Sequence, residues 1–187
     1  DLTVEQAVLA ASLGVPADQA ATWHFPGVPD ATSAERLEHG LADVGHARWR
    51  ANADAIRRVA GQPDLIATGM CIGPFSLMTK VLREPITAVY LAGSGITAAE
   101  DDEVRALEQV LELCVRTVEA SIRAQAEAGA TLMFICEPAA NTVYLSLLQV
   151  EQGGSDVWER LVMQPNLRLR SLLADLDVDL LFHDCGE

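Results

Sequence analysis

An α/β fold is predicted for this chain, because short apolar runs alternate with long amphipathic segments. Three apolar runs end near Met70, Cys136 and His183, and each has the length of a buried strand. Strand–helix–strand connections favour a parallel sheet with crossover helices. Three such units supply roughly half of an eight-stranded barrel. We therefore expect a partial (β/α)8 TIM barrel.

An N-terminal helical segment, residues 1–60, is expected to precede the partial barrel of residues 61–187. Thr3 and Gln6 have the spacing of a capping box, which predicts a helix from residue 3 to 13. A loose apolar stripe predicts one long helix from about Ser33 to Ala60.

The first strand of the partial barrel is expected to begin at Leu65 and to end near Met70. Gly73-Pro74 then predicts a tight turn into a short helix, since proline suits the first helical position. The residues that follow, up to Gly95, are expected to be less regular. Thr97 begins a further capping box and the clearest amphipathic helix of the chain.

That long helix is predicted to end at Gly129, before a buried strand over residues 132–136. A later helix, to about Asp175, should be interrupted near Pro165, because proline has no N–H to donate. The third strand ends at His183.

The formal net charge of −14 argues against two classes of partner, nucleic acids and anionic membranes. Nucleic-acid binding and docking to an anionic membrane both need clustered lysine and arginine. No apolar run approaches the ~20 residues that span a bilayer. The four cysteines are too sparse for a disulfide framework, which favours a cytoplasmic protein with reduced thiols.

His183 and Cys185 are the strongest candidate metal ligands. Side chains at positions i and i+2 of a strand point to the same face, so both are expected to aim the same way. Imidazole and thiolate together suit Zn²⁺. Two ligands do not complete a site, however.

Glu137 is the candidate catalytic residue, because a carboxylate directly after a buried strand must be solvated, paired or functional. It shares a face with Ile135 and Met133, which we expect to be the barrel mouth. The turn at Gly73 places helix N–H groups near the strand ends, where they can meet an anion. Gly73, Phe75 and Ser76 are therefore candidate binding residues, although ordinary strand–helix geometry is the favoured explanation of the turn.

Three motifs together resemble the uroporphyrinogen decarboxylase superfamily: Gly73-Pro74-Phe75-Ser76-Leu77, Glu137-Pro138-Ala139 and Phe182-His183-Asp184-Cys185-Gly186. Their order and approximate spacing are similar to those of the family. The terminal His-x-Cys-Gly is more similar to the cobalamin-dependent methyltransferases of this superfamily, of the methylcobamide:thiol type, than to the decarboxylases. The resemblance covers roughly residues 60–187.

The resemblance implies a (β/α)8 barrel and a zinc ion held by His183, Cys185 and a second cysteine further along the chain. That second cysteine would lie beyond Glu187, so we expect the chain to be part of a longer protein. The implied activity is zinc-dependent methyl transfer between a corrinoid, carried by a partner protein, and a small thiol or folate. Zinc would hold the thiol as a thiolate, the form that attacks a methyl group. Glu137 would add an oxygen ligand, orient His183 or accept a proton.

Two alternatives remain open from the sequence. One is a metal-free decarboxylase acting on a tetrapyrrole, although the Arg-rich segment typical of that branch is absent near the N-terminus. The other is a non-catalytic half-barrel that pairs with another copy or chain to cover its open edges, which predicts a homo-oligomer.

Overall fold

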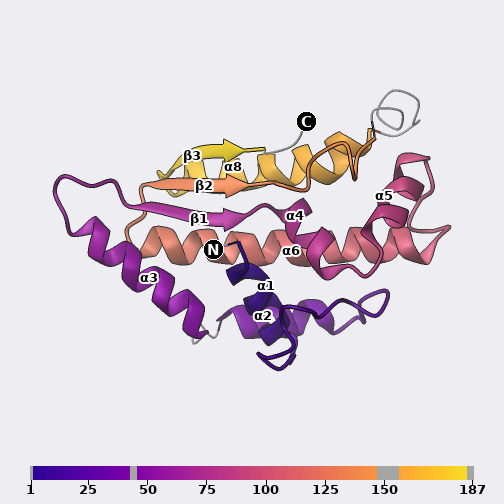
Figure 1. Ribbon diagram of the computed structural model, residues 1–187, viewed down its shortest axis with the longest axis horizontal. Helices are drawn as coiled ribbons and strands as arrows, with labels where there is room; N and C mark the ends of the chain where they lie inside the picture. Colours follow the sequence, from indigo (N-terminus) through magenta and orange to yellow (C-terminus); the bar gives the residue numbers. More distant parts are fainter. Residues whose placement is uncertain (1, 43–45, 147–155, 185–187) are drawn as a thin grey trace.

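The computed structural model describes residues 2–42, 46–146 and 156–184 of the chain. Its centre is a parallel sheet of β1 (Thr68–Ile72), β2 (Leu132–Cys136) and β3 (Asp179–His183), in the order β1-β2-β3 (Figure 1). The α/β class and the parallel sheet are therefore confirmed.

Helices connect the strands and precede them. After β1 come α4 (Pro74–Val81), α5 (Pro85–Gly93) and α6 (Asp102–Glu127), and before β3 come the π-helix η1 (Glu159–Met163) and α8 (Gln164–Asp175). The N-terminal helices are α1 (Val4–Ser12), α2 (Ser33–Ala42) and α3 (Ala47–Ala60), and all three contact α6. No helix of the described residues is long and apolar enough to cross a bilayer.

The two faces of the sheet differ in their burial. Met133 and Ile135 of β2 are fully buried in the core that the sheet forms with the helices. On this face α6 contacts β1, and α8 contacts β3. On the other face, Met70 is 39% exposed and Leu181 is 45% exposed. We call this second face the open face. Its apolar residues are those that would line the interior of a barrel if more strands closed it.

Several predicted elements are confirmed. The strand over residues 132–136 and the strand that ends at His183 are observed, and Gly129 terminates the long helix region with φ +102°. The predicted interruption near Pro165 is observed as the π-helical turn η1, which ends directly before α8 and its Pro165. Proline cannot donate to the carbonyl four residues earlier, and a π-helical turn accommodates that loss.

Two predictions about the N-terminal segment are wrong. The single helix of residues 33–60 is two helices, because His46 has extended backbone angles (φ −63°, ψ 123°) and caps α3. The Thr3–Gln6 capping box does not form, since Thr3 makes no side-chain cap bond. The Gln6 amide instead donates to the carbonyls of Ala20 and Ala21, each at 3.3 Å, and so fixes the following loop.

The region around β1 and α6 also differs from the prediction. The strand lies later than expected, and Ile66 is 70% exposed before it begins. Helix α5 was not predicted at all. The Thr97–Glu100 pair forms, with Thr97 Oγ1 donating to Glu100 at 2.7 Å, but it closes a separate turn. Asp101 is the N-cap of α6, accepting from the N–H of Glu103 at 2.7 Å.

Candidate functional site

The carboxyl ends of the three strands meet at one edge of the sheet. Ile72 is in register with Cys136, and Cys136 with His183. Past the strands, the Gly73 N–H donates to the Cys136 carbonyl at 2.6 Å, and the Glu137 N–H donates to the His183 carbonyl at 2.9 Å. The structure therefore brings residues of all three sequence motifs together, at the edge where parallel sheets carry their sites.

Glu137 is fully buried, and its carboxylate lies at the N-terminus of α4. One oxygen, Oε1, accepts from the Phe75 N–H at 3.1 Å and from the Asn166 amide at 2.9 Å. The other, Oε2, accepts from the Ser76 N–H at 2.8 Å. The carboxylate thus satisfies helix N–H groups that would otherwise have no partner, and the helix dipole favours its negative charge.

The side chain of Glu137 points toward the helices. It shares the face of Met133 and Ile135, as strand alternation predicts, but that is the helix-covered face and not the open one. Asn166 of α8, which holds one of its oxygens, also donates to the Val162 carbonyl of η1 at 2.9 Å. The π-helical turn and the carboxylate are therefore joined by a single amide.

Gly73 is required by this arrangement. A Cβ atom at this position would lie 2.1 Å from Cδ of Glu137, closer than two non-bonded carbon atoms can approach. Ser76 adds a second link, because its Oγ accepts from the Ala139 N–H at 2.9 Å. The turn after β1 and the turn after β2 are thereby fixed to each other.

Burial raises the pKa of the Glu137 carboxyl above its ordinary value, and the hydrogen bonds from Asn166 and Ser76 act in the opposite direction. A raised pKa suits a group that exchanges protons, but desolvation of any buried carboxyl produces it as well. The catalytic role of Glu137 and the binding roles of Gly73, Phe75 and Ser76 stay predictions. All four are buried, and two of the helix N–H groups already donate to Glu137.

His183, the first candidate metal ligand, is the last residue of β3 and is exposed. Its ring centroid lies 5.6 Å from that of Phe134, with the rings tilted by 35°. Cys185, the second candidate, lies outside the described residues. Within the described ranges no three histidine, cysteine or acidic side chains gather in a way that could hold a metal ion.

A second buried carboxylate, Glu5 of α1, was not singled out from the sequence. Its Oε1 accepts from Ser121 Oγ of α6 at 2.7 Å, and its Oε2 has no hydrogen-bond partner among the described residues. Burial raises the pKa of Glu5, with the Ser121 hydrogen bond acting against it. Nothing in the first turn of an amphipathic helix distinguishes such a residue from a solvated glutamate.

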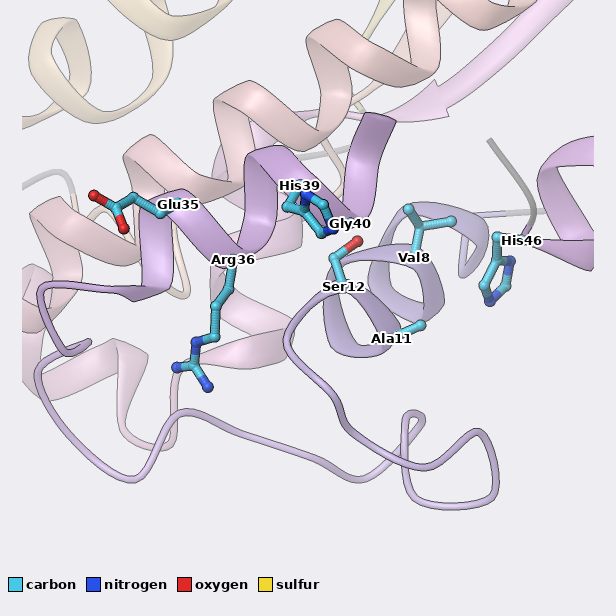
Figure 2. Close-up of a pocket in the computed structure, with 8 residues that line it drawn as sticks. All are labelled: Val8, Ala11, Ser12, Glu35, Arg36, His39, Gly40 and His46. Atoms are coloured by element: carbon cyan, nitrogen blue, oxygen red, sulfur yellow. The ribbon is translucent and has the colours of Figure 1, made fainter. Parts of the chain in front are cut away.

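A cavity of about 620 Å³ lies between α1 and α2. His39 and His46 line it, but Figure 2 shows them well separated, with Glu35 directed away from both. Gly40 lets the two helices approach closely here, since a Cβ would lie 2.5 Å from that of Ser12. The side chains do not converge on a point, so the cavity offers no set of metal ligands.

Comparison with known proteins places the fold but not the family. No family model matches the sequence, and no curated protein matches it. The structure is similar to that of a methyltransferase from Methanosarcina mazei, with a TM-score of 0.56 and 17% sequence identity. The match covers 85% of this chain and 39% of that one, so this chain corresponds to well under half of the larger protein. At this identity the likeness shows a shared fold.

Proposed function

We propose that this chain is part of an enzyme that transfers a methyl group. One observation carries the proposal: a fold shared with part of a methyltransferase presents His183 at the carboxyl end of a parallel strand. The fold alone permits many activities. The three motifs, which resemble the cobalamin-dependent methyltransferases of the uroporphyrinogen decarboxylase superfamily, favour this one.

The donors present suit zinc. His183 is exposed at a strand end where a ligand can reach it, and its imidazole is an ordinary zinc ligand. The His-x-Cys spacing supplies a thiolate through Cys185. Zinc with few protein ligands keeps a coordination position for a thiol substrate and makes that thiol a nucleophile at neutral pH.

The residues around His183 have supporting roles in this proposal. The Phe134 ring lies beside the imidazole, with the ring centroids 5.6 Å apart. The Glu137 N–H holds the His183 carbonyl, and the Glu137 carboxylate fixes α4 against the end of β2. The Glu137 carboxylate lies on the opposite face of the sheet from the His183 ring, so its part in this proposal is to hold the turn after β1 in place. We infer a corrinoid protein as methyl donor, a small thiol or folate as acceptor, and a cytoplasmic location.

Zinc analysis tests the proposal. The purified full-length protein that contains this chain, its His183→Ala and Cys185→Ala variants, and the control His24→Ala, an exposed histidine elsewhere, are loaded with zinc and dialysed. We expect about one zinc per chain in the wild type and the control, and none in the two ligand variants. Demethylation of methylcobalamin by a small thiol, followed by the absorption of the corrinoid, then tests the reaction. A wild type that binds no zinc would contradict the proposal.

The open face favours a second candidate, an interaction module. Met70 of β1 and Leu181 of β3 are both more than a third exposed, on the same face of the sheet and on either side of β2. A second copy of the chain would cover them. Light scattering on Leu181→Lys and the wild type tests this: a dimer that the lysine dissociates, in protein that binds no zinc, would favour the module.

A further inference from the structure

Glu5 lies on the face of α1 that packs against the rest of the molecule. It is 0% exposed, and its neighbours on this face, Val8 and Leu9, are also buried. Helix α1 contacts β1, α4 and α6, besides the N-terminal helices α2 and α3. An ionisable group therefore stands within a contact that is otherwise largely apolar, where a charge is costly.

The groups around Glu5 compensate a negative charge only in part. Its Oε1 accepts from Ser121 Oγ at 2.7 Å, and Ser121 Oγ in turn accepts from the Gln125 amide at 3.1 Å. Its Oε2 has no hydrogen-bond partner among the described residues. Neither of these α6 side chains carries a charge. The docked position of α1 therefore favours the neutral carboxylic acid of Glu5, whereas water favours the carboxylate.

One titratable group of β1 lies close to Glu5. Burial raises the pKa of the Cys71 thiol well above its ordinary value, and Glu5 is the charge that adds most to this rise. The amino terminus of the chain lowers the pKa of Glu5, but more weakly than the Ser121 hydrogen bond does.

The charged side chains of the surrounding helices meet other parts of the molecule. On α6, Glu119 pairs with Arg168 of α8, and Arg123 is exposed. Those of α2, α3 and α4 that lie near α1 are at its start or along the cavity of Figure 2: Lys80, Arg48, Glu35, Arg36, His39 and His46. The balance between burial and the Ser121 hydrogen bond therefore decides the ionisation of Glu5.

Helix α1 depends on its contacts for its stability, and the chain around it permits separation. It has nine residues, and isolated helices shorter than about 12 residues are marginal in water. Gly14, just after it, has φ +84°, and an irregular loop follows. That loop is held to the body of the protein at Phe25, whose N–H donates to the Val81 carbonyl at 2.8 Å. The residues before Phe25 can therefore separate together by local opening.

We propose that α1 is a pH-dependent cover over β1 and α6, docked when Glu5 is a neutral acid and released when Glu5 is a carboxylate. The inference goes beyond the proposed function and does not depend on it. Release brings the Cys71 thiol, close to Glu5, into contact with solvent. Cys114 of α6 is also fully buried, but Glu137 and not Glu5 is the carboxyl that raises its pKa, so Cys114 lies away from α1.

The release should occupy a defined pH range. Burial raises the pKa of Glu5 in the docked helix, whereas the released carboxyl has its ordinary value. Docking is fully favoured below the ordinary pKa and weakens as the pH rises to the raised one. Over this range the open fraction should increase by up to about tenfold per pH unit, and beyond it the fraction should stay constant. Glu5→Gln does not ionise, so its open fraction should not follow this course.

Thiol labelling tests the proposal on the full-length protein that contains this chain. The rate at which Cys71 reacts with 4,4′-dithiodipyridine, which thiols attack even at acidic pH, measures the opening of α1. Mass spectrometry of peptides reports Cys71 and Cys114 separately. Division of the wild-type rate by the Glu5→Gln rate at each pH removes the pH dependence of the thiol itself. We expect this ratio to rise with pH for Cys71 and to stay constant for Cys114. Glu35→Gln, an exposed glutamate of α2, is the control and should match the wild type.

Hydrogen exchange provides a second measurement, which needs neither a variant nor a thiol. Exchange of the α1 amides, relative to the rate in an unfolded peptide, should accelerate over the same pH range, while the amides in the middle of α6 stay protected. A Cys71 ratio that does not change with pH overturns the proposal. So does a parallel rise for Cys71 and Cys114, because the whole domain would then be unfolding and α1 would not move alone.

Discussion

Glu137 and Glu5 are both fully buried, yet their surroundings differ. The Glu137 carboxylate accepts three N–H groups, from Phe75, Ser76 and Asn166. Glu5 accepts one hydroxyl, and its second oxygen has no hydrogen-bond partner in the described part of the chain. Burial raises the pKa of both carboxyls. Burial alone therefore does not show that a carboxylate stabilises the structure. The number of hydrogen-bond donors distinguishes Glu137, which holds neighbouring segments together, from Glu5, whose charge is only partly compensated.

Removal of the Glu137 carboxylate should have the largest effect. Glu137→Ala leaves the N–H groups of Phe75 and Ser76 without an acceptor and opens a cavity. We expect a loss of about 3–5 kcal/mol in the free energy of unfolding, measured with urea. The control is Glu127→Ala on the exposed surface of α6, which should change stability by less than ~0.5 kcal/mol. Equal effects of the two substitutions would contradict this account of Glu137.

Gly73→Ala should have the next largest effect. The new methyl group would lie 2.1 Å from Cδ of Glu137, so the turn or the carboxylate must move, at a cost of about 1–3 kcal/mol. Gly27→Ala is the matched control, because nothing lies within 4 Å of its Cβ position. In a Glu137→Ala background, Gly73→Ala should reduce the free energy of unfolding much less, because the clash with the carboxylate is gone. A cost that is the same in both backgrounds would show that the carboxylate is not what constrains the glycine.

The strands and the proline-induced interruption could be predicted because they depend on local sequence. Apolar runs, a terminal glycine and Pro165 act within a few residues of themselves. Alternation also predicted correctly that Glu137 shares the face of Ile135. Packing between distant elements decides which face of the sheet the helices cover. The sequence therefore does not predict that the Glu137 carboxylate points toward α4 and α8 and not toward the barrel interior.

The residues next to His183 could not be predicted from the sequence, because strand register also depends on packing between distant elements. The register between β2 and β3 places Cys136 beside it, and no spacing within a single motif encodes that register. Glu5 was likewise invisible, since its partner Ser121 lies on a helix more than a hundred residues later.

Glu5→Gln should raise stability at neutral pH by about 1 kcal/mol, while Glu137→Gln should lower it. A neutral amide removes the cost of burying the Glu5 charge, which few donors offset. At Glu137 the new NH2 group would face N–H donors in place of an acceptor. Urea unfolding of both variants at pH 7 measures the difference. Destabilisation by both substitutions to the same extent would mean that the two carboxylates are equivalent.

The advantage of Glu5→Gln should depend on pH. The folded-state pKa of Glu5 is raised, so the folded protein binds its proton more tightly than the unfolded chain does. The wild type therefore loses stability relative to the variant as pH rises from the ordinary carboxyl pKa through the raised one. Below that range the two proteins should be nearly equal in stability. If the stability advantage of Glu5→Gln shrinks as the pH rises, the folded-state pKa of Glu5 is lowered and not raised.

Ser121→Ala should have an effect of similar size, about 0.5–1.5 kcal/mol, since the hydroxyl loses its hydrogen bonds to Glu5 and from Gln125. Its cost should be larger above the Glu5 transition, where the carboxylate is charged, than below it, because the hydroxyl stabilises the charged form. In the Glu5→Gln background this pH dependence should vanish, although the bond from Gln125 to Ser121 at 3.1 Å is lost in both cases. Ser171→Ala on the exposed side of α8 controls for the loss of a hydroxyl on a helix. A cost of Ser121→Ala that is independent of pH would assign the effect to Gln125, and Glu5 would then differ from Glu137 by more than its number of donors.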